Sequence, residues 1–267
     1  MAIKFGCCLN MVAGAPEFVG AEHIENAAKA GFEYVELPLA EMMCLSKPRH
    51  DEIRAILNAN GLRYETSNNF FPKTIRLTGE DVNMPKVMEY VKQALGLAGS
   101  FGVSYVVFGS GGAKNVPDGF PMNKGYAQVV DLLTKVGPVA KDNGITITIE
   151  PLRKAECNLI NTFEEGCKLA MDVNDPNVKV LIDYYHMSVE QESPDILLKY
   201  GKDFLRHTHF ARHEGRVYPK DISEDAYRPF IDALKAIGYD GRVSCEAYSN
   251  NFYADAVQAV KFFKDNF

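Results

Sequence analysis

The chain has 267 residues, 46% of them hydrophobic and 24% charged, a composition typical of a folded protein with a large core. Its net charge of −6 argues against a nucleic-acid backbone as the main partner, because phosphate binding favours a basic surface. No apolar run is long enough to span a membrane, and the N-terminus does not resemble a signal peptide. The six cysteines have no metal-site or disulfide-module spacing, so we expect reduced thiols in a cytoplasmic protein.

Strand patterns and helix patterns alternate eight times along the chain. The predicted strands are Ile3–Leu9, Tyr34–Leu37, Arg63–Thr66, Ser104–Phe108, Ile145–Glu150, Val178–Asp183, Phe204–His209 and Gly241–Glu246. The predicted helices lie near Pro16–Ala30, Pro48–Asn60, Met84–Phe101, Met122–Asn143, Thr162–Val173, Ser188–Tyr200, Glu224–Ile237 and Tyr253–Phe267. Glycines that can end a helix in the left-handed conformation follow five of them, at Gly31, Gly61, Gly102, Gly144 and Gly238.

Eight strand–helix units without a linker or low-complexity segment predict one domain over residues 1–267, a single (β/α)8 TIM barrel. A doubly wound open sheet is the alternative, and it would place its site in a crevice at one switch point. The polar strand ends favour the barrel, because they fall on four consecutive strands that only a closed sheet makes convergent.

Four predicted strands end in a side chain that can bind a metal. These residues are Glu150, Asp183, His209 and Glu246. Period-2 alternation puts Glu150 on the same strand face as Thr148, and His209 on the same face as His207. A purely structural barrel interior favours branched apolar residues, so polar side chains at the strand ends indicate an active site there.

Three carboxylates and one imidazole form a mostly hard ligand set. Such a set suits Mn²⁺, Mg²⁺ or Co²⁺ better than a structural Zn²⁺ bound by thiolates. A divalent ion in an open site polarises a carbonyl and stabilises an enediolate. Glu150 and Glu246 also offer one acid and one base, so the residues indicate proton transfer next to a carbonyl.

Several longer motifs resemble the xylose isomerase-like barrel superfamily, and within it the sugar epimerases of the D-tagatose 3-epimerase and D-psicose (allulose) 3-epimerase kind. The resemblance covers essentially the whole chain. It is strongest in FGSGGAKNVPDGF (Phe108–Phe120), IEPLRKAECNLINT (Ile149–Thr162), LIDYYHM (Leu181–Met187), HTHFARHEGRVYP (His207–Pro219) and CEAY (Cys245–Tyr248).

The resemblance implies a metal-dependent ketose 3-epimerase that works through an enediolate. It implies four metal ligands, Glu150, Asp183, His209 and Glu246, with Mn²⁺ as the first expectation. Glu150 and Glu246 would also move the protons. The implied substrate-binding residues are Glu156, His186 and Arg216; the offset of His186 from Asp183 already puts it near the mouth of the barrel. The partner would be a small-molecule sugar, with no nucleic acid or membrane, and the chain would form a homodimer or homotetramer, as relatives often do.

Other reactions use the same chemistry. A lyase or dehydratase, or an aldose–ketose isomerase, acting on a sugar or inositol derivative would need the same metal and proton abstraction. A DNA-repair enzyme of the AP endonuclease IV kind shares the fold, but it needs several more histidines and a basic groove. The glycines at Gly109–Gly112, followed by Lys114, could bind the phosphate of a sugar phosphate or simply form a tight turn.

Overall fold

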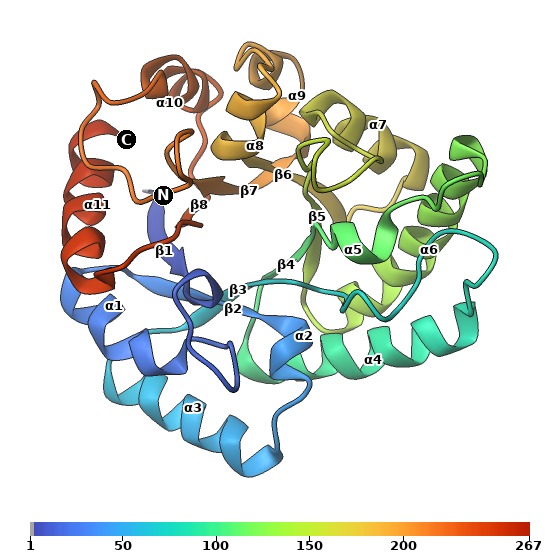
Figure 1. Ribbon diagram of the computed structural model, residues 1–267, viewed down its shortest axis with the longest axis horizontal. Coiled ribbons are helices and arrows are strands. Elements are labelled where there is room, and N and C mark those ends of the chain that lie inside the picture. The colour runs from blue at the N-terminus through green and yellow to red at the C-terminus, as the bar shows by residue number, and fades with distance from the viewer. Residues whose placement is uncertain (1–2) are drawn as a thin grey trace.

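The computed structural model describes residues 3–267, so Met1 and Ala2 of the predicted domain lie outside the described residues. Eight parallel strands form a closed barrel in chain order, with β1 paired to both β2 and β8 (Figure 1). The strands are β1 (Lys4–Cys8), β2 (Tyr34–Pro38), β3 (Tyr64–Asn68), β4 (Tyr105–Phe108), β5 (Thr146–Ile149), β6 (Val178–Asp183), β7 (Leu205–Phe210) and β8 (Arg242–Cys245). The predicted (β/α)8 barrel is confirmed.

Helices surround the barrel as a ring (Figure 1). They are α1 (Ile24–Ala30), α2 (Leu39–Met42), α3 (Lys47–Ala59), α4 (Met84–Phe101), α5 (Gly111–Lys114), α6 (Met122–Asp142), α7 (Phe163–Val173), α8 (Tyr184–Val189), α9 (Ile196–Phe204), α10 (Tyr227–Ala236) and α11 (Phe252–Asn266). Two 3₁₀ turns, η1 (Leu9–Met11) and η2 (Ala21–His23), follow β1. Within residues 3–267, no helix combines the length and apolar character needed to cross a bilayer.

All five glycines predicted to end helices have positive φ angles, between 65° and 99°. Their conformation is the left-handed one that a glycine adopts without steric cost. The glycine pattern therefore located the helix ends well, although it gave no information on where each helix begins.

The helix predicted near Pro16–Ala30 starts too early. In the structure α1 begins at Ile24, and a loop and the turn η2 precede it. Phe18 and Gly20 have φ angles of 55° and 84°, which no continuous right-handed helix contains. A Cβ at Gly20 would also lie 2.4 Å from the backbone oxygen of Leu9, so the loop packs too closely on η1 to form a helix there.

The single helix predicted over Ser188–Tyr200 is two helices, α8 and α9. Gln191 has a φ angle of 56°, and Pro194 lies two residues before α9 begins. A left-handed residue ends one helix and proline favours the start of the next. The first of them, α8, also begins earlier than predicted, at Tyr184 directly after β6, which brings its first turn to the mouth of the barrel.

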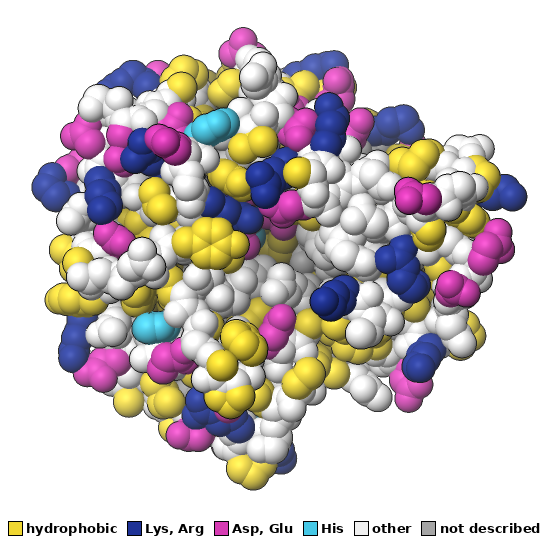
Figure 2. All heavy atoms as spheres, in the orientation of Figure 1, with side chains coloured by type: hydrophobic (Ala, Val, Ile, Leu, Met, Phe, Trp, Pro, Cys, Tyr) yellow, Lys and Arg dark blue, Asp and Glu magenta, His cyan; other side chains and the backbone are white. Residues whose placement is uncertain are grey.

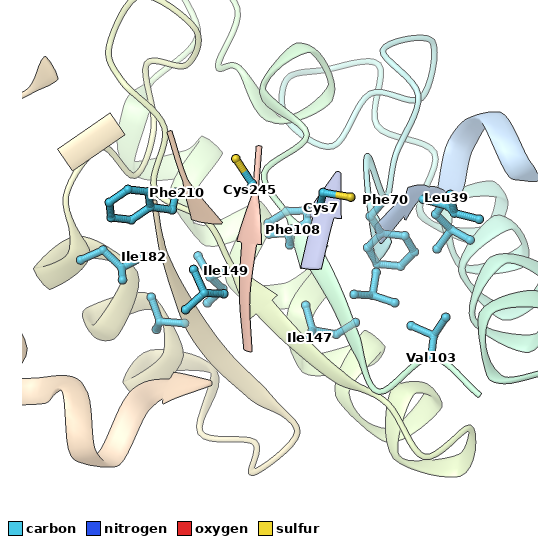
Figure 3. Close-up of a cluster of buried hydrophobic side chains, with 14 of the residues drawn as sticks. Cys7, Leu39, Phe70, Val103, Phe108, Ile147, Ile149, Ile182, Phe210 and Cys245 are labelled. Carbon is cyan, nitrogen blue, oxygen red and sulfur yellow. The ribbon is translucent and has the colours of Figure 1, made fainter. Parts of the chain in front are cut away.

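The outer faces of the strands form the hydrophobic core with the helices. Ile147 and Ile149 of β5, Ile182 of β6 and Cys245 of β8 are at most 2% exposed (Figure 3). Each large aliphatic side chain buried in this way contributes about 1.5–3 kcal/mol. Because the outer layer holds the strands in place, the inner faces are free to carry polar residues.

Candidate active site

Four side chains from consecutive strands meet at the carboxyl end of the barrel, and we call them the carboxylate–histidine cluster: Glu150, Asp183, His209 and Glu246. One potential ligand atom of each lies within 4.8 Å of the others. His209 Nδ1 is 2.9 Å from Glu150 Oε1 and 3.2 Å from Glu246 Oε2. All four residues are at most 7% exposed. The structure thus brings together the four residues that the strand ends suggested as ligands.

The strands position each member of the cluster. Glu150 and Glu246 stand one residue beyond β5 and β8, and their backbone N–H groups still donate to β4 and β7, at 3.2 and 3.1 Å. Asp183 ends β6, and its Oδ1 accepts a 2.8 Å hydrogen bond from the N–H of Tyr185 at the start of α8. This cap leaves Asp183 Oδ2 directed at the cluster, where it approaches His186 and Arg216.

All three carboxyl groups are buried, but their charged neighbours make them unequal in proton affinity. Burial raises the pKa of Asp183 to about 7, although the nearby Arg216 opposes the shift. Burial also raises the pKa of Glu150, against the opposing effect of His209. For Glu246, burial alone would raise the pKa, but Arg216 and His209 together bring it well below its usual range. The cluster therefore does not favour three ionised carboxylates without an additional cation.

Arg216 supplies positive charge to this buried site. Its guanidinium hydrogen-bonds Glu246 and lies 3.5 Å from Asp183 Oδ2. The same group stacks over the ring of Tyr185 at 4.7 Å and is 3.9 Å from Glu156 Oε1. Arg216 was predicted from its motif alone, and it reaches the cluster from the loop after β7.

His186 and Glu156 complete the predicted set around the same opening. His186 is 2% exposed, and its Nε2 lies 3.6 Å from Asp183 Oδ2. Its Nδ1 accepts a 3.3 Å hydrogen bond from the backbone N–H of Arg153, which assigns the ring proton to Nε2. Burial and Arg216 lower the pKa of His186 to about 3, so the ring is neutral. Glu156 lies further out, with Oε1 2.7 Å from Arg153 Nε.

A cleft of about 610 Å³ opens above the cluster and is lined by Glu150, Glu156, His186, Arg216 and Glu246. Figure 2 shows this face of the molecule hollowed near its centre, with acidic and basic side chains around the hollow. On the opposite side the wall comes from the loops after β2, β3 and β4. The backbone at Gly109 approaches Glu150 closely, since a Cβ there would lie 2.2 Å from Glu150 Oε2. The volume is within the range of small-molecule sites.

Lys114 does not offer the cationic phosphate contact considered from the sequence. Its side chain is fully buried, its Nζ donates to the backbone oxygen of Glu150 at 3.2 Å, and it lies 5.3 Å from the Phe108 ring centroid. Gly109–Gly112 do line the cleft where α5 begins, and the lysine that lines the cleft beside them is Lys73, whose Cβ would lie 3.0 Å from a Cβ at Gly112. Lys114 thus supports the backbone that carries Glu150.

Glu36 on β2 is a site residue that the sequence reasoning missed. It is fully buried beneath the cluster, and its Oε1 is 3.0 Å from His209 Nε2. Burial alone would lower the pKa of His209, but Glu36 and Glu246 raise it well above its usual value. A signal was present in the sequence, since Glu36 is a carboxylate inside the apolar strand YVELP.

The donor set fits a divalent cation. Three buried carboxylates and one imidazole converge within 4.8 Å, and Arg216 neutralises them only in part. In the described part of the chain, two further groups could hold an ion: Glu36, His207 and His209, and Cys8, His209 and Glu246. All three groups share His209, but Glu36 and Cys8 lie beside its Nε2, whereas Glu150 and Glu246 lie beside its Nδ1.

The fold and this geometry define a class of protein: a parallel β/α barrel with a carboxylate–histidine cluster at the carboxyl ends of its strands. The family model described as "Xylose isomerase-like TIM barrel" matches residues 24–266. The chain belongs to this family.

Relatives with assigned activities indicate which class of enzyme this family member belongs to. The chain is 28% identical to L-ribulose 3-epimerase of Methylomonas sp. strain DH-1 and 27% identical to D-psicose 3-epimerase of Agrobacterium fabrum. Each match covers 85% of this chain and 78% of the relative. The fold also superposes on D-psicose 3-epimerase with D-tagatose from Clostridium cellulolyticum H10, with a TM-score of 0.87, 20% identity and 99% of each chain covered. The protein is an enzyme of the isomerase class.

Proposed function

We propose that this protein is a metal-dependent sugar epimerase whose reaction is the 3-epimerisation of a ketose through an enediolate. The observation that carries the proposal is the position of Glu150 and Glu246 beside His209 Nδ1, at 2.9 and 3.2 Å, at the base of the cleft. The two relatives named as 3-epimerases support the same reaction.

Glu150 and Glu246 would move the protons. Epimerisation inverts a stereocentre, so a proton must leave one face of the carbon and return to the other. Two carboxyl groups can do this without the intermediate turning over in the site. The pKa of Glu150 is raised mainly by burial, whereas that of Glu246 is lowered by Arg216 and His209 despite its burial. Carboxyl groups that differ in proton affinity can act as acid and base at the same pH.

The cluster would also hold the metal, with Mn²⁺ as the first expectation and Mg²⁺ or Co²⁺ as alternatives, because its donors are mostly carboxylate oxygens. When bound, such an ion polarises the sugar carbonyl and stabilises the negative charge of the enediolate. Glu150 and Glu246 would then be ligands as well as proton carriers, and Asp183 and His209 would be ligands alone.

Three further residues would bind and orient the sugar. The neutral His186 presents its Nε2–H towards the cluster, where it can donate to a sugar oxygen. Arg216 lies among Glu246, Asp183 and Glu156, so it can donate to oxygens close to the reacting carbon. Glu156 can accept a hydrogen bond from a hydroxyl at the rim. Such fixed contacts hold the reacting carbon between the two glutamates.

A single experiment tests reaction and metal together. Free ketoses and ketose phosphates are incubated in D₂O with metal-stripped enzyme, with and without added Mn²⁺, and followed by proton NMR. We expect chelation to abolish turnover, Mn²⁺ to restore it, and each product molecule to carry deuterium at C3. Full activity of a preparation proved metal-free by elemental analysis would contradict the metal dependence.

The same spectra separate the alternative reactions. Deuterium at C1 and none at C3 would indicate aldose–ketose isomerisation. Loss of water or of another group from the sugar would indicate a lyase or dehydratase. In both cases the same residues would bind the metal and move the proton, but the product would differ.

A further inference from the structure

A buried carboxylate lies directly beneath the carboxylate–histidine cluster. Glu36 is fully inaccessible to solvent, and its two oxygens face four hydrogen-bonding groups. Oε1 lies 3.0 Å from His209 Nε2. Oε2 accepts from Thr66 Oγ1 and Ser244 Oγ, both at 2.7 Å, and lies 2.9 Å from His207 Nε2. An ionised carboxylate only accepts hydrogen bonds, so each ring nitrogen that faces Glu36 carries a proton.

This contact determines which nitrogen of His209 is free. A neutral imidazole has one N–H and one lone pair. In the neutral ring, which is the form that can bind a cation, Nε2 keeps the proton that it donates to Glu36, so the lone pair is on Nδ1. Nδ1 is also the atom that lies beside Glu150 and Glu246. The ring is therefore oriented so that its ligating atom and the carboxylates face the same point.

Packing around Glu36 prevents the carboxylate from turning away. Tyr34 Oη lies 2.9 Å from Ser244 Oγ; since Ser244 donates to Glu36, Tyr34 donates to Ser244. The Tyr34 ring fills the space above Gly6, where a Cβ would lie 2.5 Å from the ring. Tyr105 stacks on His207 with an interplanar angle of 7° and 6.1 Å between ring centroids. Tyr34, Glu36, Thr66, His207 and Ser244, all fully buried, form what we call the buried polar layer.

We propose that Glu36 is a positioning residue: it keeps the proton of His209 on Nε2, and so directs the Nδ1 lone pair at the cation. Glu36 does not line the cleft and would act only through His209. The inference rests on the proposed metal site and goes beyond it, because it assigns the cation affinity partly to a strand that contributes no ligand. Partners of metal-binding histidines commonly change metal affinity by about 10–100-fold when removed.

Two substitutions of Glu36 test the proposal. Glu36→Leu removes the acceptor at similar volume, so the Nε2–H is left unpaired and the ring proton moves to Nδ1, where it competes with the cation. Glu36→Gln retains a weaker, neutral acceptor. We expect Mn²⁺ affinity, measured by calorimetry, to fall about 10–100-fold in Glu36→Leu and by less in Glu36→Gln.

A second measurement needs neither metal nor sugar. In metal-free ¹⁵N-labelled protein, the buried Nε2–H of His209 should give a slowly exchanging NMR signal, identified by its absence in His209→Asn. It should shift in Glu36→Gln and disappear in Glu36→Leu. A wild-type protein that binds no Mn²⁺ but shows this dependence would refute the proposed metal site while supporting the proton-holding action of Glu36.

Glu65 provides the matched control. It is also a buried glutamate on a barrel strand, and it is 6% exposed. However, Glu65 pairs with Lys4 at 2.9 Å and with Arg242 at 2.6 Å, and all three residues lie near the amino ends of their strands, away from the cluster. Glu65→Gln and Glu65→Leu should leave the His209 signal in place and Mn²⁺ affinity within about twofold. Equal losses in the Glu36 and Glu65 variants, or an unchanged His209 signal and Mn²⁺ affinity in Glu36→Leu, would overturn the proposal.

Discussion

The two halves of the barrel contribute differently to the site. The half formed by β5–β8 supplies the whole carboxylate–histidine cluster, one residue for each strand. The half formed by β1–β4 supplies no member of that cluster. It provides Glu36 beneath His209, the glycine turn beside Glu150 and the loops that form the far wall of the cleft.

The comparison shows that the residues proposed to react and the residues that orient them come from different strands of one closed sheet. Residues that carry the reaction need only reach the mouth, so they stand at strand ends. Residues that orient them must touch them from the side or from below, and the closed barrel provides both directions. Substitutions in the two halves should therefore have different effects. In the β5–β8 half they should remove a reacting group, and in the β1–β4 half they should displace a reacting group that is still present.

The largest effect is expected in the half that carries the cluster. Glu150→Gln and Glu246→Gln should each reduce net epimerisation by about 10²–10⁴-fold, because an amide cannot transfer the proton. Where metal is retained, each variant should still exchange the C3 proton of one epimer in D₂O, and the two should prefer opposite epimers. Proton NMR of both epimers measures this.

Glu214 provides a control for these two substitutions. Its side chain is 84% exposed in the loop after β7, where it pairs with Arg212, and Glu214→Gln should leave turnover within about twofold. If either cluster variant retained near-normal epimerisation, the assignment of the proton carriers would be wrong.

A smaller loss is expected from the supporting half. Gly109→Ala places a methyl group 2.2 Å from the present position of Glu150 Oε2, so the carboxylate must move. Because a misplacement of about 1 Å can cost about 10²-fold in rate, we expect kcat to fall by about that factor while the protein stays folded. Steady-state kinetics and a thermal melt test this. Normal kcat would mean that Glu150 tolerates displacement and that this half is less important than we infer.

The pH dependence of cation binding should follow Asp183, whose pKa is raised to about 7 mainly by burial. Between about pH 4 and 7 the metal-free folded state keeps a proton that the unfolded chain has lost, so this group's contribution to stability falls as pH rises. A cation requires the ionised carboxylate and displaces that proton. Mn²⁺ affinity should therefore fall about tenfold for each pH unit below 7 and level off above it.

Calorimetry at several pH values, in two buffers with different ionisation enthalpies, measures both the affinity and the proton released. Asp183→Asn should abolish most of the affinity. A flat pH profile with no proton release in the wild-type enzyme would show that Asp183 is already ionised before the cation binds.

The smallest effect is expected outside both halves, on the exposed side of α4. Gly96 has open space around its missing Cβ, and its φ angle is not positive. Gly96→Ala should raise the free energy of unfolding by about 0.4–1 kcal/mol, because alanine restricts the unfolded chain and favours helix. Denaturant unfolding measures this, and kcat should be unchanged. A loss of activity here would contradict the view that only the barrel and its mouth loops set the chemistry.

The sequence by itself determined the eight strand–helix units, the helix ends at five glycines and the four residues at successive strand ends. These follow from local rules: a period of two sets the face of a strand residue, and a left-handed glycine ends a helix. Seven predicted site residues converge on one opening because parallel strands in a closed barrel deliver their carboxyl ends to one face. Their individual roles stay predictions.

Only the tertiary structure decided which of these residues support one another. Glu36 and His209 are separated by 173 positions, and their contact exists only because barrel closure turns both side chains inward at the same depth. Lys114 was considered as a cleft cation, yet the turn after β4 directs it into the interior. The start of α1 was likewise set by the close approach of Gly20 to Leu9. Local periodicity determines the face on which a side chain lies, but its partner depends on which distant strands the closed sheet brings together.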